Sequence, residues 1–247
     1  MAKAKVLSVA NQKGGVGKST TVYNLGAGLA MSGKKVLALD VDPQGDLTKM
    51  LGQRKPHELP LTLANSMNDV VSGAMARGHP EIMHHHEGFD FVPGNRSLSA
   101  VEVGLVNVMS RETVLRQYVD SVKQDYDYVL LDCRPSLGML VINALAASDY
   151  VLIPVQADYL AAEDMTELVG TVQSIKRQIN PRLKIGGVFL TMARGMKRCV
   201  TARCRKSGPS SCLSVALTAT VLRPIRILSI PPQNFGRNYI NKTHPTK

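Results

Sequence analysis

Apolar residues along the first part of the chain alternate between short continuous runs and stretches with a helical period. The continuous, β-branched runs predict strands at 5–10, 35–40, 88–93, 126–132, 150–155 and 184–191. Apolar positions at helical spacing predict helices at 19–33, 61–73, 97–123, 138–147 and 165–179. Strands that alternate with helices predict an α/β fold, in which helices cover both faces of a mostly parallel sheet in three layers.

This pattern stops after Met192, and the charge changes at nearly the same point. Residues 1–185 hold 19 Lys and Arg against 19 Asp and Glu, whereas residues 186–247 hold 11 Lys and Arg and no acid. The whole net charge of +11 therefore comes from the last quarter of the chain. We expect a domain over 1–192 and a basic, atypical tail over 193–247. The tail is explained either by an out-of-frame or rearranged C-terminus or by true divergence.

Composition excludes several classes of protein. No run of about 18 apolar residues exists, so we expect no transmembrane helix. The first residues lead directly into a strand, which leaves no room for a signal peptide and predicts a cytoplasmic protein. The cysteines lack the spacing of a zinc site, and we expect three adjacent histidines to be solvated in a surface loop. These residues are Cys133, Cys199, Cys204, Cys212, His84, His85 and His86.

The strand at 5–10 leads into a glycine-rich loop that also opens the first helix. Its residues are Gly14, Gly15, Val16, Gly17, Lys18, Ser19 and Thr20. Glycines at a helix N-terminus let main-chain N–H groups face phosphates without side-chain clashes, and the helix end favours an anion. In such a P-loop Lys18 contacts the β- and γ-phosphates, and the Ser19 hydroxyl binds Mg²⁺. The sequence therefore predicts a nucleotide site of the P-loop NTPase fold.

The loop departs from the ordinary P-loop, because Gln12 stands where a glycine is expected and Lys13 follows it. The string KGGVGKST resembles the deviant Walker A motif of the ParA/MinD family of P-loop ATPases. That resemblance implies ATP and Mg²⁺ as cofactors and a homodimer that forms on ATP binding. It also implies that Lys13 reaches the partner's phosphates and acts there as an arginine finger does. The alternative is an ordinary solvated lysine.

Two acidic motifs support the resemblance. Asp42 follows the second strand in a segment similar to the family's first switch, which implies that it orients the attacking water while Asp40 supports Mg²⁺. The two residues could otherwise be simple turn formers. The strand at 126–132 resembles a Walker B strand, so Asp132 is expected to support Mg²⁺ from beyond its direct ligands.

The residues after Asp132 resemble the family's second switch, through Cys133, Pro135 and Gly138. Arg134 replaces the first of two prolines, which loosens the backbone and adds a cation near the phosphates or the dimer face. We expect Cys133 to be a buried, inert thiol.

The resemblance extends over about residues 3–192 and is nearest to chromosome- and plasmid-partitioning members. It implies a slow ATPase associated with the nucleoid, whose dimer binds double-stranded DNA non-specifically. It also implies a centromere-binding partner protein that stimulates this hydrolysis. One alternative is a nucleotide-binding regulator with impaired hydrolysis. Another is the membrane-associated, division-site branch, which the polar last residues of the chain disfavour. The single core cysteine, Cys133, also disfavours an iron-sulfur reductase.

Overall fold

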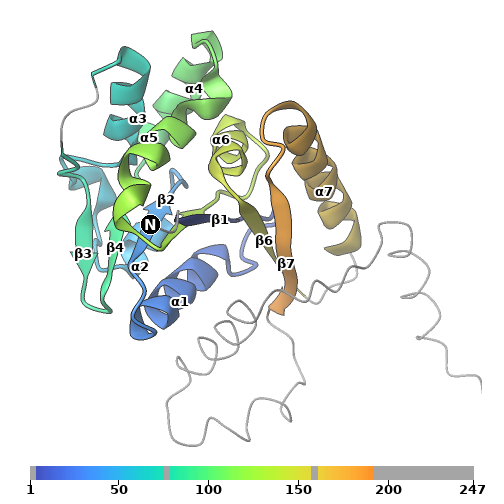
Figure 1. Cartoon of the computed structure of the whole chain (residues 1–247), viewed down its shortest axis with the longest axis horizontal. Coiled ribbons are helices and arrows are strands. Elements are labelled where there is room, and N and C mark those ends of the chain that lie inside the picture. Colours follow the sequence, from blue (N-terminus) through green and yellow to red (C-terminus); the bar gives the residue numbers. More distant parts are fainter. Residues whose placement is uncertain (1–3, 75–77, 157–160, 192–247) are drawn as a thin grey trace, which may run out of the picture.

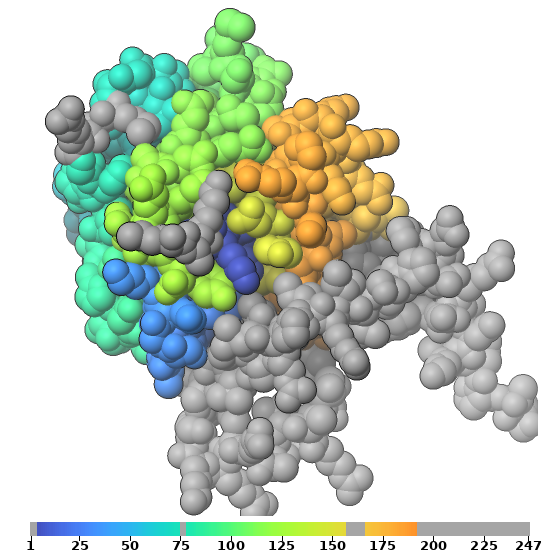
Figure 2. Space-filling view, in the orientation of Figure 1, coloured from blue at the N-terminus to red at the C-terminus, as the bar shows by residue number. Residues whose placement is uncertain are grey.

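A seven-stranded sheet forms the centre of the computed structural model, which describes residues 4–74, 78–156 and 161–191. The strand order is β3-β4-β2-β5-β1-β6-β7, and every described pairing is parallel except β3 with β4. β3 and β7 lie at opposite sides of the molecule (Figures 1 and 2). The bounds are β1 Lys5–Val9, β2 Val36–Asp40, β3 Met83–His85, β4 Phe89–Val92, β5 Tyr128–Asp132, β6 Tyr150–Gln156 and β7 Lys184–Thr191.

Helices cover both faces of the sheet, because successive residues of each buried strand point to opposite sides. In β2, Leu37 and Leu39 belong to one apolar cluster, and Val36 and Ala38 belong to the other. The first cluster contains side chains of α3 Leu63–Ser72, α4 Ser97–Gly104, α5 Val114–Val122, α6 Met139–Ala147 and α7 Ala161–Gln178. The second contains side chains of α1 Lys18–Met31 and α2 Asp46–Met50. The predicted three-layer α/β fold is confirmed.

Three parts of the secondary structure differ from the prediction. The single helix expected at 97–123 is wrong, because the chain forms α4 and α5 with irregular turns between them. Ser110 has a φ of 55°, a left-handed conformation that an α-helix cannot continue through. The short helix α2 and the edge strand β3 were not predicted. Four 3₁₀ turns complete the described elements: η1 Pro56–Glu58, η2 Leu105–Asn107, η3 Arg111–Thr113 and η4 Lys123–Asp125.

The three adjacent histidines are not all in a solvated surface loop, so that expectation is wrong. His84 and His85 belong to β3, and His85 is only 4% exposed. The His85 ring packs against Phe89 and the edge of Tyr23, with centroids 5.1 and 5.7 Å apart. Strand alternation leaves His84 exposed on the other side. An apolar partner for one histidine of the run is something that local sequence alone does not reveal.

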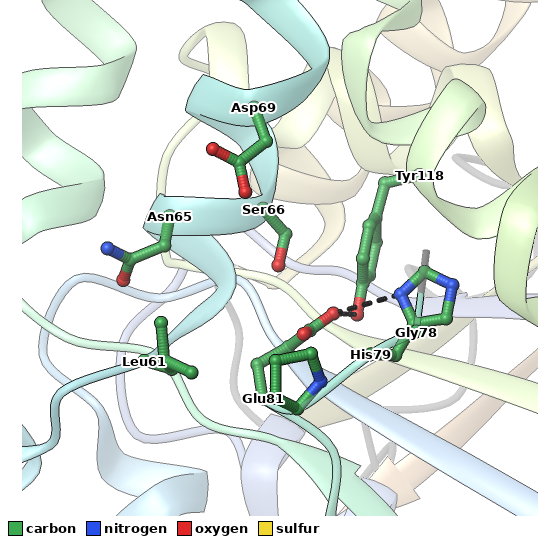
Figure 3. Close-up of a pocket in the computed structure, with 9 residues that line it drawn as sticks. Leu61, Asn65, Ser66, Asp69, Gly78, His79, Glu81 and Tyr118 are labelled. Atoms are coloured by element: carbon green, nitrogen blue, oxygen red, sulfur yellow. Dashed lines mark hydrogen bonds and ion pairs between the residues drawn. The ribbon is translucent and has the colours of Figure 1, made fainter. Parts of the chain in front are cut away.

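A small cavity of about 60 Å³ lies beside α3 and α5, and no residue of the glycine loop lines it. The buried Glu81 carboxylate lies at its wall (Figure 3). The Tyr118 hydroxyl donates to Glu81 Oε1 at 2.5 Å, and His79 Nδ1 lies 3.2 Å from the same oxygen. These contacts satisfy a buried carboxylate, which would otherwise be costly.

The expected tail at 193–247 lies outside the residues that the structure describes. Its candidate DNA-binding cations lie there too, namely Lys197, Arg198, Arg203, Arg205 and Lys206. Among the described residues, none of the helices has the length and apolar character that crossing a membrane requires.

Candidate nucleotide site

The glycine loop joins β1, which lies between β5 and β6, to the N-terminus of α1, at the carboxyl edge of the sheet. Gly15 and Gly17 have φ values of 73° and 86°, in the left-handed region that side chains other than glycine rarely adopt. Gly17 precedes the first helical residue, Lys18, so the free N–H groups of the helix end face the loop. This geometry suits an anion, as the sequence predicted.

Lys18 is turned inward and is only 7% exposed. Its Nζ donates to the main-chain oxygen of Lys13 at 3.0 Å. Burial lowers the pKa of Lys18, while the carboxylates of Asp132 and Asp42 oppose that shift. A phosphate oxygen would compete with the Lys13 carbonyl for this amine, and the bond to the phosphate would be the stronger one because it joins two opposite charges.

Two side chains that the sequence analysis missed hold the loop in place. Asn11 Nδ2 donates to the oxygen of Pro154 in β6 at 2.6 Å, and Asn11 Oδ1 accepts the N–H of Lys13 at 2.9 Å. Thr191, the last residue of β7, donates its hydroxyl to the oxygen of Val16 at 2.9 Å. The position of Asn11 directly before the loop was an available signal. Thr191 is 175 residues away from Val16, so no local pattern could have indicated it.

Asp40 and Asp132 lie side by side, because β2 and β5 are adjacent parallel strands with these residues in register. By the two-residue alternation of each strand, both side chains point to the face that α1 covers. Both residues are almost completely buried. Burial raises the pKa of Asp132 well above its usual range, and the nearby Asp40 carboxylate adds a smaller shift in the same direction. The neighbouring Ser19 hydroxyl acts in the opposite direction.

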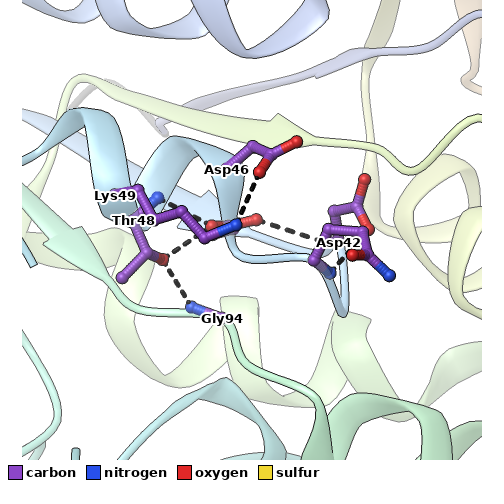
Figure 4. A network of polar contacts seen from close by, with 7 residues as sticks. Asp42, Asp46, Thr48, Lys49 and Gly94 are labelled. Carbon is purple, nitrogen blue, oxygen red and sulfur yellow. Dashed lines mark hydrogen bonds and ion pairs between the residues drawn. The ribbon is translucent and has the colours of Figure 1, made fainter. Parts of the chain in front are cut away.

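Asp40 accepts hydrogen bonds from Asp42 and Thr48. Thr48 also contacts Gly94 in the loop after β4 (Figure 4). Asp40 Oδ2 accepts the N–H and the hydroxyl of Thr48 at 2.8 and 2.6 Å, and Asp40 Oδ1 accepts the N–H of Asp42 at 3.2 Å. Gly94 N–H donates to the same Thr48 hydroxyl at 2.9 Å. Burial raises the pKa of Asp40 to about 6, although these hydrogen bonds act to lower it.

Asp42 lies on the half-exposed side of the same segment. Its Oδ1 accepts the N–H of Gln44 at 2.9 Å, and its main-chain oxygen accepts the N–H of Gly45 at 2.9 Å. Pro43 between them is buried, and it fixes the local backbone. The Asp42 carboxylate is therefore held by its own turn and keeps one oxygen available for other contacts.

Asp132 differs from Asp40, because neither of its buried carboxylate oxygens accepts a hydrogen bond from a described residue in ordinary geometry. These two oxygens have no hydrogen-bond partner in the described part of the chain and lie near the Ser19 hydroxyl, and carboxylate oxygens are ligands of the kind that Mg²⁺ prefers. No group of three His, Cys, Asp or Glu side chains in the described ranges could hold a metal ion alone. That fits Mg²⁺, which usually takes one or two protein ligands together with phosphate oxygens and water.

Replacing Asp132 by asparagine should stabilise the protein at neutral pH when nucleotide and Mg²⁺ are absent. A folded-state pKa above the unfolded value means that the folded protein binds more protons than the unfolded chain at pH values between the two. The free energy of unfolding therefore falls as the pH rises from the unfolded pKa to the folded pKa. Asp132→Asn removes one such group, which should flatten the pH dependence by about 1 kcal/mol per pH unit.

Urea unfolding between pH 4.5 and 7.5, in the presence of a chelator, measures this slope. The exposed Asp46, substituted by asparagine, serves as the control and should leave the slope nearly unchanged. Parallel pH profiles for the wild type and Asp132→Asn would contradict the prediction.

The segment that we expect to form the second switch begins directly after Asp132. Cys133 is buried, its thiol is free, and burial raises its pKa above the usual range, so the predicted buried thiol is confirmed. Arg134 Nη1 donates to Glu102 Oε2 on α4 at 2.5 Å. The charge that Arg134 adds is therefore balanced by a partner that the sequence analysis did not identify. Pro135 is exposed, and Gly138 caps the N-terminus of α6.

Comparisons with known proteins agree with this geometry. A family model described as an AAA domain matches residues 4–185. The sporulation initiation inhibitor protein Soj of Bacillus subtilis is 44% identical over 190 residues, which are 76% of this chain and 72% of that protein. The chromosome partitioning protein ParA of Caulobacter vibrioides is 39% identical over 190 residues, which are 76% and 69% of the two chains. The chain belongs to the ParA family. The resemblance carried by its two-lysine loop is confirmed.

Solved structures of similar fold extend the comparison beyond the ParA sequences. Cobyrinic acid a,c-diamide synthase from Mycobacterium smegmatis, bound to ADP and magnesium, has a TM-score of 0.71 and 33% identity, and the match covers 87% of this chain and 82% of that one. A plasmid partition protein from Borrelia burgdorferi has a TM-score of 0.62 and 26% identity, with 76% and 78% covered. An ATP complex of a Cyanothece McdA variant has a TM-score of 0.69 and 25% identity, with 90% and 81% covered.

Proposed function

We propose that this ParA-family chain is a partitioning ATPase with ATP and Mg²⁺ as cofactors. In this proposal, two copies bind ATP face to face, and the dimer binds double-stranded DNA non-specifically in the cytoplasm, on the nucleoid. A centromere-binding partner protein stimulates slow hydrolysis, which releases the dimer. Residues 1–192 carry this activity as the ATPase domain, and residues 193–247 form a separate basic tail.

The observation that supports this proposal is the different placement of the two loop lysines, Lys13 and Lys18. Lys18 is buried and lies where the phosphates of a nucleotide in its own subunit would bind. Lys13 is half-exposed at the rim of the loop, and its backbone N–H and oxygen contact Asn11 and Lys18. A second cation at the rim of a phosphate site is suited to act on the nucleotide of a partner subunit.

The remaining roles follow from where the side chains lie. Main-chain N–H groups of residues 14–20 cradle the phosphates, the Ser19 hydroxyl binds Mg²⁺, and the orphaned Asp132 carboxylate and Asp40 support the ion from beyond its direct ligands. When bound, Mg²⁺ neutralises charge on the phosphate oxygens. Asp42, held by its turn, orients the attacking water near the γ-phosphate. Phosphoryl transfer needs mainly such positioning and charge stabilisation. Slow hydrolysis is sufficient for a switch, because the bound γ-phosphate itself holds one conformation until it is removed.

Phosphate release from ATP and Mg²⁺, titrated with duplex DNA of arbitrary sequence at low and moderate salt, tests the proposal. We expect slow release that rises with DNA and whose stimulation falls with salt, because non-specific binding depends on phosphate contacts. Release that does not respond to DNA would contradict the DNA-bound switch. ATP binding without any release would favour a nucleotide-binding regulator, for which the replacement of proline by Arg134 is the supporting observation.

A further inference from the structure

One carboxylate on α4 holds both ends of the segment 134–138, which follows the Walker B strand. Glu102 Oε2 accepts a hydrogen bond from Arg134 at the start of the segment, and Glu102 Oε1 accepts the N–H of Leu140 just past its end, at 3.3 Å. Leu140 lies in the first turn of α6, where a carboxylate is favoured by the free N–H groups. The side chains of Arg134 and Glu102 are only 32% and 20% exposed, so solvent screens this pair less than a surface pair.

Gly138 is required by a close side-chain contact and not by its backbone conformation. Its φ of −71° and ψ of −179° are extended values that any residue adopts. A Cβ atom at this position, however, would lie only 2.3 Å from Glu102 Oε1. The glycine therefore leaves room for the Glu102 side chain, and a larger residue would displace that flexible carboxylate.

The helix that carries Glu102 is also connected to the first switch. Its first residue, Ser97, donates its N–H to Asn95 Oδ1 at 3.1 Å. The neighbouring Gly94 donates to the Thr48 hydroxyl that in turn donates to Asp40. The helix α4 is therefore connected to Asp40 through Gly94 and Thr48, and to the segment that follows Asp132 through Arg134.

We propose that Glu102 is a positioning residue for the second switch: it holds the segment 134–138 against α4 through Arg134 and the N-terminus of α6. A proline restricts the backbone by its own ring, whereas an arginine does not. Where Arg134 replaces the proline, the ion pair with Glu102 supplies the constraint from a side chain instead. The kinetic part of this inference rests on the proposed ATPase function, but the structural part does not.

The test is a double-mutant cycle of Glu102→Gln and Arg134→Gln in the full chain. Glutamine keeps the shape of Glu102 and an oxygen for the Leu140 N–H, so the substitution removes mainly the charge. We expect ATP affinity to change less than twofold, kcat to fall roughly tenfold, and hydrogen exchange of the amides at 134–140 to increase. The double variant should show no further loss, because both substitutions break the same contact.

Glu112→Gln is the matched control, because Glu112 forms an ion pair at comparable exposure with Arg111, a residue outside the segment 134–138. It should leave kcat and the exchange of 134–140 unchanged. Two results would overturn the inference: unchanged exchange at 134–140 in Glu102→Gln, or multiplicative effects of the two substitutions. If the wild type releases no phosphate, the proposed ATPase function fails, while the exchange measurements of the same cycle still decide the role of Glu102.

Discussion

Alanine at position 13 should leave ATP binding nearly intact and lower phosphate release by about a thousandfold, as loss of an arginine finger does. The backbone of Lys13 has two structural contacts, since its N–H donates to Asn11 and its oxygen accepts the Lys18 amine. Both contacts survive the substitution, so the loop should keep its shape. What the variant loses is the side-chain cation that we assign to the partner subunit's nucleotide.

Lys18→Ala, by contrast with Lys13→Ala, should weaken ATP binding itself. Removing the buried amine should cost about 3 kcal/mol of nucleotide affinity, which is roughly a hundredfold. Lys34→Ala, at an exposed position just after α1, should change neither quantity. Direct ATP binding, phosphate release and the molecular mass in solution with ATP distinguish the three variants. Lys13→Ala that dimerises and hydrolyses ATP normally would end the proposed role in the partner's site.

Gly94→Ala should lower the free energy of unfolding by about 3 kcal/mol, near the upper end for an overpacked position. A Cβ at Gly94 would lie 2.4 Å from the main-chain oxygen of Asp40 and 3.0 Å from its carboxyl carbon. The first of these atoms belongs to the end of a buried strand and cannot rotate away as a flexible side chain would. The backbone at Asp40 or at Gly94 must therefore move, which disturbs the hydrogen bonds of Thr48 as well.

Gly104→Ala provides the matched control within the same region. A Cβ there meets no atom within 4 Å, and φ is −61°, so the substitution suits the end of α4. It should raise stability by about 0.5 kcal/mol or slightly more. Urea denaturation of both variants measures the difference. Equal stability of Gly94→Ala and the wild type would show that the contact with Asp40 is not as tight as the structure has it.

The predictions from sequence succeeded where a local pattern reports directly on local structure. The buried strands appeared as apolar runs, and β1, β2, β5, β6 and β7 agree with them to within two residues. The chain between 97 and 123 failed the same reasoning, because apolar residues keep a helical spacing there although the backbone breaks at Ser110. The strand β3 was missed because its histidines carry no apolar alternation.

The sequence by itself determined the phosphate loop and the candidate residues at the ends of the strands. Glycines, two lysines and a hydroxyl must be contiguous to wrap an anion, so their chemistry is legible in one short string. Only the tertiary structure decided what supports them. Asn11 reaches β6, Thr191 reaches the loop from β7, and Glu102 pairs with Arg134 across 32 residues. Such contacts depend on which strands and helices become neighbours, and that choice is made by the burial of apolar surface over the whole domain.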